Sequence, residues 1–199
     1  MSVMSIEKRK KKYIKKVIEV LKQDGLRLSI DEVAVKMNIT KKTLYNHFSS
    51  KEELIKECIL SISSDMQEAI SNLDNTDNSA IENLRKGFSE ITLLFETLSP
   101  VFFYDIMRMN PNEAAAEHLI GSGLFQKKMA ANLQQGIKEG TYRDDIDIEN
   151  ISRYLSYSVF GFYINSITKN NPYLPKSYFN EIIEYNLRAI VSNKGRTLL

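Results

Sequence analysis

The polar side chains whose types and spacing suggest chemistry lie close together, in a stretch that follows Thr40. The stretch combines lysines, a hydroxyl, a phenol, an amide and an imidazole: Lys41, Lys42, Thr43, Tyr45, Asn46 and His47. Lysine and hydroxyl groups bind phosphate oxygens, and at base edges in the major groove lysine pairs with guanine and asparagine with adenine. This set of side chains therefore indicates contact with a nucleic acid.

Two short helices joined by a tight turn would present this set. Ser29 and Glu32 have the spacing of a capping box that starts one helix, and Thr40 can cap a second helix over residues 41–48. Asn38 lies between them and tolerates the positive φ that a tight turn needs. Cations at 41 and 42 would oppose the dipole of the second helix, and a polyanion would compensate that repulsion. The pattern predicts a helix-turn-helix that contacts DNA.

The segment before this motif predicts an amphipathic helix from Ile6 to Asp24, ended by Gly25. Its polar face carries the basic run Lys8–Lys12 together with Lys15 and Lys16. We expect these cations to attract DNA at long range or to reach its minor groove.

The rest of the chain also predicts helices. Ser50 and Glu53 repeat the capping box and start a long helix to about residue 72, and the polar stretch 73–79 is the best linker candidate. Further helices are expected over 79–98, 101–109, 112–139, 148–169 and 175–193. No alternating strand pattern is found, so the expected fold is all-α with about nine helices.

Charge and composition narrow the function. Residues 1–60 hold 14 Lys and Arg against 8 Asp and Glu, a net charge of +6, whereas residues 61–199 have a net charge of −4. The single Cys58 and two His exclude an internal disulfide framework and a Cys-rich zinc site, and no metal or cofactor is expected. Acidic residues and His118 are too scattered to nominate a catalytic site, so we do not expect an enzyme. No stretch has the roughly 18 apolar residues of a membrane span, and we expect a cytoplasmic protein.

Residues 29–54, "SIDEVAVKMNITKKTLYNHFSSKEEL", resemble the DNA-binding region of the tetracycline-repressor (TetR) family. The family pattern runs through "T-L-Y-x-H-F" to "S-K-E-E-L", and the similarity covers about residues 9–60. The segment "GIKEGTYRDDID" at 136–147 is similar to the loop that precedes the dimerisation helices of the family. Asn38 stands in the turn where the family usually has a glycine.

The resemblance implies a role for each matching position. Phosphate contacts would come from Ser29, Thr40, Thr43, Tyr45, His47 and Lys51. The side chains nearest to base edges would be Lys41, Lys42, Thr43 and Asn46. The resemblance also implies a helix-turn-helix DNA-binding domain at 1–50 and a helical ligand-binding and dimerisation domain at 51–199.

The family resemblance further implies a homodimeric repressor that binds a palindromic operator and is released by an apolar or aromatic small molecule. Large apolar residues could line its pocket: Met66, Phe95, Phe102, Phe103, Met107, Phe125, Tyr157 and Phe160. The last two helices would pair with their copies, and small residues would allow close approach: Ser152, Ser156, Ser158 and Gly161. An activator of the same fold, or a helical protein-interaction module without DNA binding, remains an alternative.

Overall fold

The computed structural model describes residues 3–108, 122–157 and 178–199, and within these ranges the side chains of 3–7, Pro100, Phe103, Ile106, Met107 and Ser122 are not described. The described chain is built of helices, and its only strand-like feature is one isolated bridge between Tyr142 and Val191. The predicted all-α fold is confirmed.

The chain divides into two compact units. Unit 1 comprises Met1–Ser64 and Thr97–Leu119, and unit 2 comprises Asp65–Glu96 and Ile120–Leu199. Helix α4 (Lys51–Ser71) contributes its first part to unit 1 and its end to unit 2. The division into functional domains at residue 50 stays a prediction.

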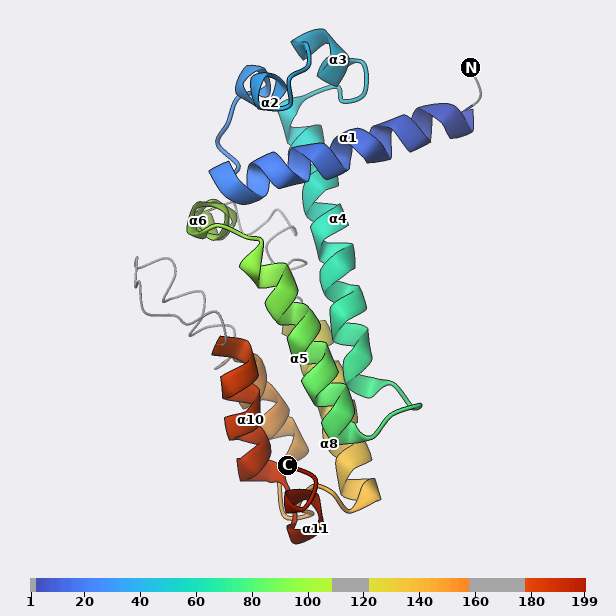
Figure 1. The fold of residues 1–199 in the computed structure, drawn as a ribbon, viewed down its shortest axis with the longest axis vertical. Coiled ribbons are helices and arrows are strands. Elements are labelled where there is room, and N and C mark those ends of the chain that lie inside the picture. Colours follow the sequence, from blue (N-terminus) through green and yellow to red (C-terminus); the bar gives the residue numbers. More distant parts are fainter. Residues whose placement is uncertain (1–2, 109–121, 158–177) are drawn as a thin grey trace. The chain divides into compact units, whose positions relative to one another are not determined.

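Unit 1 contains α1 (Val3–Asp24), α2 (Ile30–Lys36), α3 (Lys41–Tyr45), the first part of α4, and α6 (Pro100–Arg108). Figure 1 shows α1 crossing α4, with α2 and α3 beside the start of α4. The apolar stripe of α1 is buried, as its periodicity predicts: Ile14, Val17, Ile18 and Leu21. Gly25 ends the helix with φ +85°, the left-handed conformation expected of a C-cap glycine.

The caps of the helix-turn-helix follow the sequence closely. Ser29 and Glu32 form the complete capping box of α2, and Asn38 has φ +53°. Helix α3 is shorter than predicted, because it ends at Tyr45 and not at Phe48. The amides of His47 and Phe48 both donate to the carbonyl oxygen of Leu44, so a tightened last turn still carries Phe48 into the core.

Helix α6 is attached to the α1–α2 loop by buried polar contacts. The buried Asp105 carboxylate accepts from the amide of Leu26 at 2.8 Å and lies 2.8 Å from Nε of Arg27. The amide of Ser99 also donates to the carbonyl oxygen of Lys22 at 2.7 Å. A Cβ atom at Gly25 would lie 2.5 Å from the Asp105 carboxylate, so the glycine also provides the space for this attachment.

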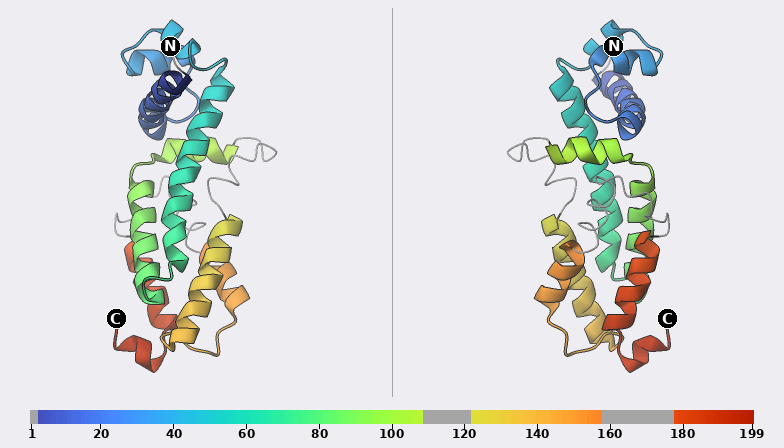
Figure 2. Two further views of the ribbon diagram at one scale, coloured as in Figure 1. Left: turned by 90° about the vertical axis from the view of Figure 1, so that its right-hand side faces the viewer. Right: turned by 90° about the vertical axis from the view of Figure 1, so that its left-hand side faces the viewer.

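Unit 2 contains the 3₁₀ turn η1 (Asn72–Asp74), α5 (Ala80–Glu96), α8 (Ser122–Glu139), a helical segment at 148–157, α10 (Tyr178–Ile190) and α11 (Asn193–Arg196). Helices α5, α8 and α10 run side by side (Figures 1 and 2). Aromatic pairs join them: Phe88 with Phe125 at 5.9 Å and Phe95 with Phe179 at 5.0 Å between ring centroids. The sequence did not predict α11, which Ser192 caps.

The stretch 73–79 is a packed turn of unit 2, and its interpretation as a linker is wrong. Leu73 is fully buried, and Nδ2 of Asn132 donates to the carbonyl oxygens of Leu73 at 2.7 Å and Ala80 at 2.9 Å. Nδ2 of Asn83 donates to the carbonyl oxygen of Asn75 at 2.6 Å. The composition suggested a linker because these partners come from α5 and α8, beyond the turn itself. Among the described helices, none is both long and apolar enough to span a bilayer.

Candidate nucleic-acid interface

Helix α3 presents a polar surface outward and an apolar one inward. Leu44 and Phe48 are buried, whereas Lys42, Tyr45 and Asn46 are exposed, and Tyr45 is 45% exposed. Asn46 is the C-cap residue of α3, so its side chain stands at the end of the helix. Lys42 and Asn46, whose side chains suit guanine and adenine, are therefore accessible.

Lys41 is less free than its position in the sequence suggests. Its Nζ lies 3.0 Å from the Asp31 carboxylate on α2 and 5.8 Å from the centre of the Tyr45 ring. The hydrogen bond from Lys41 to Asp31 raises the pKa of the lysine. Asp31 thus offsets part of the repulsion between Lys41 and the dipole of α3, a compensation that the sequence analysis assigned to DNA alone.

The hydroxyls expected to contact phosphates serve as helix caps. Oγ of Ser29 accepts from the amide of Glu32 at 3.2 Å and donates to its carboxylate at 2.8 Å. Oγ1 of Thr40 accepts from the amide of Thr43 at 3.2 Å and lies 2.8 Å from its hydroxyl. These four side chains lie at the N-terminal ends of α2 and α3, where the helix dipole favours anions.

His47 and Lys51 are tied to other parts of unit 1. The half-buried His47 ring packs at 4.7 Å from the ring of Tyr13 on α1. Nζ of Lys51 donates to the carbonyl oxygen of Arg27 at 3.1 Å. Tyr13 is not among the residues predicted to form the site, because nothing near it in the sequence indicates a contact with residue 47.

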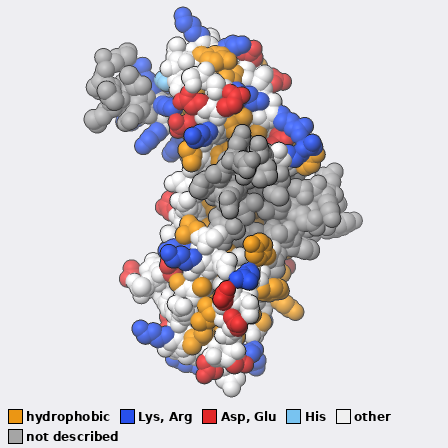
Figure 3. Space-filling model, turned by 180° about the vertical axis from the view of Figure 1, so that it is seen from behind, with side chains coloured by type: hydrophobic (Ala, Val, Ile, Leu, Met, Phe, Trp, Pro, Cys, Tyr) orange, Lys and Arg blue, Asp and Glu red, His pale blue; other side chains and the backbone are white. Residues whose placement is uncertain are grey.

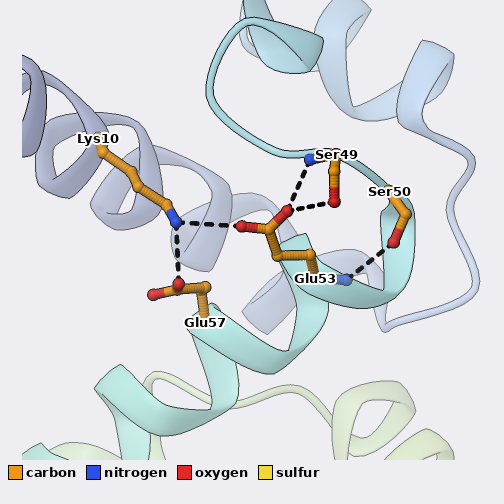
Figure 4. A network of polar contacts seen from close by, with 5 residues as sticks. All are labelled: Lys10, Ser49, Ser50, Glu53 and Glu57. Carbon is orange, nitrogen blue, oxygen red and sulfur yellow. Dashed lines mark hydrogen bonds and ion pairs between the residues drawn. The ribbon is translucent and has the colours of Figure 1, made fainter.

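A polar network connects α1 to the turn between α3 and α4 (Figure 4). Nζ of Lys10 lies 3.2 Å from the Glu53 carboxylate and 2.9 Å from the Glu57 carboxylate. The other oxygen of Glu53 accepts from the amide and the hydroxyl of Ser49, both at 2.6 Å, while Oγ of Ser50 accepts from the amide of Glu53 at 3.1 Å. The predicted capping box is therefore present with its return bond shifted from Ser50 to Ser49.

The electrostatics of this network favour its charged state. Hydrogen bonds from Ser49 and then Lys10 lower the pKa of Glu53 to about 2. The Glu57 hydrogen bond raises the pKa of Lys10. Lys10 also lies 5.3 Å from the centre of the Phe48 ring. Lys10 and Glu53 therefore stay ionised throughout the neutral pH range.

Other cations of α1 face solvent. Exposed side chains are those of Lys8, Arg9, Lys11, Lys12, Lys15 and Lys16. In Figure 3, Lys and Arg side chains are prominent on unit 1, with a smaller group of acidic ones between them. Lys10 differs from these neighbours, because its ammonium group pairs with the two carboxylates of the network described above.

The residues predicted to line a ligand pocket fall into three groups. Met66, Phe95, Phe102 and Phe125 are buried, whereas Tyr157 is 67% exposed. The side chains of Phe103 and Met107, and the whole of Phe160, lie outside the described residues. Their role in ligand binding stays a prediction. Cys58 is buried, and burial raises the pKa of its thiol to about 12, so it is not a reactive thiolate.

The fold and this surface define a helical DNA-binding regulator of the helix-turn-helix class. Residues 14–58 match the family model described as "Bacterial regulatory proteins, tetR family". The HTH-type transcriptional repressor KstR2 of Mycobacterium tuberculosis is 24% identical over 135 residues, which cover 66% of this chain and 68% of KstR2.

Solved structures agree in fold. The structure of KstR2 has a TM-score of 0.66 at 20% identity, covering 93% of this chain and 96% of that one. A TetR transcriptional regulator from Chloroflexus aurantiacus has a TM-score of 0.71 at 11% identity, covering 95% and 99%. The chain therefore resembles TetR-family regulators, in sequence over residues 14–58 and in fold over most of its length. These matches are regulators, in agreement with the prediction that the chain is not an enzyme.

Proposed function

We propose that the protein is a dimeric repressor that inserts α3 into the major groove of a palindromic operator. The observation that carries this proposal is the two-sided character of α3, with Lys42, Tyr45 and Asn46 exposed above a buried Leu44. Lys42 would read guanine and Asn46 adenine, while the capped ends of α2 and α3 hold phosphates. The curated relative KstR2 is a repressor, which favours repression over activation. A repressor that acts on a bacterial operator would work in the cytoplasm, as the sequence predicts.

Dimerisation through the last two long helices is supported by exposed aromatic side chains on unit 2. Tyr154 and Tyr157 of the segment 148–157 and Tyr185 of α10 are all more than half exposed. Ser152 and Ser156 are buried inside the protomer, where their hydroxyls donate to the carbonyl oxygens of Glu149 and Ser152. The proposed contact between copies therefore uses the tyrosines in place of these two serines, while Ser158 and Gly161 lie outside the described residues. A dimer would set two recognition helices about 34 Å apart.

An apolar effector with one neutral oxygen is supported by the buried face of α4. In unit 1 this face comprises apolar side chains and one hydroxyl: Cys58, Ile59, Ile62 and Ser63. Ser63 is 3% exposed, and its Oγ has no hydrogen-bond partner in the described part of the chain. A buried hydroxyl is costly without a partner, and a ketone or hydroxyl oxygen of a ligand would supply one. The KstR2 structure is described as that of a ketosteroid regulator, and ketosteroids have this chemistry.

The proposed mechanism is a shift between two dimer populations. The effector would favour a dimer whose recognition helices no longer match successive major grooves, and a coupling of about 1 to 3 kcal/mol would weaken operator binding by roughly 5- to 150-fold.

Footprinting on the DNA that flanks the protein's own gene tests the proposal. We expect one protected palindrome with half-sites about one helical turn apart, and loss of protection on adding a ketone-bearing apolar compound such as a ketosteroid. Absence of any protected site would refute operator binding. Protection that no apolar compound changes would refute the effector alone.

A further inference from the structure

We propose that Lys10 is a positioning residue for DNA recognition, which holds the turn after α3 in place and does not itself touch DNA. The inference rests on the proposed use of α3 as the recognition helix. It separates Lys10 from its basic neighbours, for which the sequence analysis expected one common role in attracting DNA.

The first argument is that the charge of Lys10 is already paired within unit 1. Its Nζ lies within 3.2 Å of one carboxylate and 2.9 Å of another, on successive turns of α4. All three side chains are partly buried, with exposed fractions of 28% for Lys10, 34% for Glu53 and 37% for Glu57. A DNA phosphate would have to compete with two carboxylates for this ammonium group.

The second argument is the path from Lys10 to the recognition helix. One oxygen of Glu53 pairs with Lys10, and the other accepts from the amide and hydroxyl of Ser49 in the turn between α3 and α4 (Figure 4). The Lys10 ammonium also lies over the ring of Phe48, the residue that anchors the end of α3 in the core. Lys10 thus fixes both the ring and the amide that follow the DNA-facing residues.

The third argument concerns the two carboxylates that remain when the positive charge of Lys10 is removed. Glu53 and Glu57 are four residues apart on one helix, so their carboxylates repel each other once Lys10 no longer lies between them. Reorientation of Glu53 would release the Ser49 amide and loosen the turn. A recognition helix with a mobile end loses the geometry needed for bidentate base contacts, while attraction to phosphates depends on charge and persists.

The test compares Lys10→Met with Lys11→Met, because Lys11 is exposed and one residue away. Methionine keeps an apolar stem and removes one positive charge in both variants. Two probes are used: a duplex selected by the natural protein from a random library, and an unrelated duplex of equal length. Binding is measured by fluorescence anisotropy at several NaCl concentrations.

We expect Lys10→Met to lower the ratio of the binding constant for the selected duplex to that for the unrelated duplex by about 10-fold, the effect of one lost bidentate base contact. The slope of log K against log salt concentration should stay unchanged. Lys11→Met should weaken both duplexes alike and make the slope shallower by about 0.9. A shallower slope in Lys10→Met, or an unchanged ratio, would overturn the inference. Failure of the natural protein to enrich any duplex would instead refute the proposed function, and this inference with it.

Carboxylate variants provide the second arm. Glu53→Gln should lower the binding ratio as Lys10→Met does, and combining the two should cause no further loss. Glu52→Gln removes the same charge one residue away and should leave the ratio unchanged. If Lys10 bound DNA directly, Glu53→Gln would free it and strengthen binding to both duplexes. Lys10→Arg, which can still pair with both carboxylates, should restore the ratio, and its failure to do so while folded would contradict the proposal.

Discussion

The helix-turn-helix of unit 1 and the turn at 72–79 of unit 2 are both polar segments between helices, but their hydrogen bonds span very different distances along the chain. In the helix-turn-helix, the capping bonds of Ser29 and Thr40 reach only three residues ahead. In the turn of unit 2, the side chain that holds the carbonyl oxygen of Leu73 comes from Asn132 on α8, 59 residues away.

This difference determines how much surface each region leaves free for a ligand and how strongly a single substitution would destabilise it. Local caps hold α2 and α3 with few side chains, which leaves their outer surface free to contact a ligand as large as DNA. The turn of unit 2 is held from within by a buried side chain, and Oδ1 of Asn132 is occupied as well, by the phenol of Tyr142 at 3.1 Å. Removal of such a central group leaves several buried polar atoms unpaired at once.

Asn132→Leu should therefore have the largest effect on stability. The carbonyl oxygen of Leu73 and the buried phenol of Tyr142 would lose the partner that Asn132 provides, at about 1 to 3 kcal/mol for each group left unpaired, and the carbonyl oxygen of Ala80 would keep only its helical bond. We expect a loss of at least about 3 kcal/mol in the free energy of unfolding, measured with urea. The exposed Asn180→Leu is the control, and equal losses in both variants would contradict this role.

Asn46→Ala should affect recognition without affecting folding. Because Asn46 is exposed at the C-cap of α3, its loss should change the preference at one base position by about 1 to 3 kcal/mol. Lys51→Ala is the contrasting variant, which should weaken binding to all duplexes and reduce the salt dependence. Selection from a random library measures both, and loss of preference at every position in Asn46→Ala would argue against a base contact.

Thr40→Ala tests whether one local cap supports α3. Loss of an N-cap side chain costs about 0.5 to 2 kcal/mol, and here it would also remove the partner of the Thr43 hydroxyl. Thr40→Ser keeps the capping oxygen and should restore most of the free energy of unfolding. If alanine and serine have equal effects, the cap does not stabilise the motif.

The contrast between local and distant contacts also explains what could be predicted. The sequence predicted the fold class, the capping box at Ser29, the positive φ of Asn38 and the exposed polar face of α3, because each depends on residues a few positions apart. It missed the contact of Tyr13 with His47 and the ion pairs of Lys10, which join α1 to segments more than 30 residues away. The stretch 73–79 was predicted as a linker, because composition shows that a segment is polar and does not show which distant side chains bind its polar groups.

The pH dependence of stability should report on the Lys10 network. The pKa of Glu53 falls from an ordinary value near 4.5 to about 2 in the folded protein, so its contribution is complete above pH 4.5 and is lost as the pH falls toward 2. Glu53→Gln should lower the free energy of unfolding at pH 7 and flatten its decline between pH 4.5 and 2. Parallel curves for the natural protein and the variant over that interval would show that Glu53 is not held in its charged form.

Ser63 differs from both regions, because in the described part of the chain its hydroxyl has neither a local nor a distant hydrogen-bond partner. Ser156 is the matched comparison, a buried helical serine whose Oγ donates to the carbonyl oxygen of Ser152 at 2.7 Å. Alanine gains the same helix propensity at both sites, so the difference between the two variants isolates the hydrogen bond, worth about 1 kcal/mol.

We expect Ser63→Ala to leave the free energy of unfolding unchanged or slightly higher, with Ser156→Ala lower by that difference. A destabilised Ser63→Ala would mean that the hydroxyl is already satisfied within the protein, and it would remove the reason to assign it to an effector. With stability preserved, a weaker response to a ketosteroid in the footprinting assay would connect this hydroxyl to the ligand. A full response would leave the apolar face of α4 as the part of the site that the effector uses.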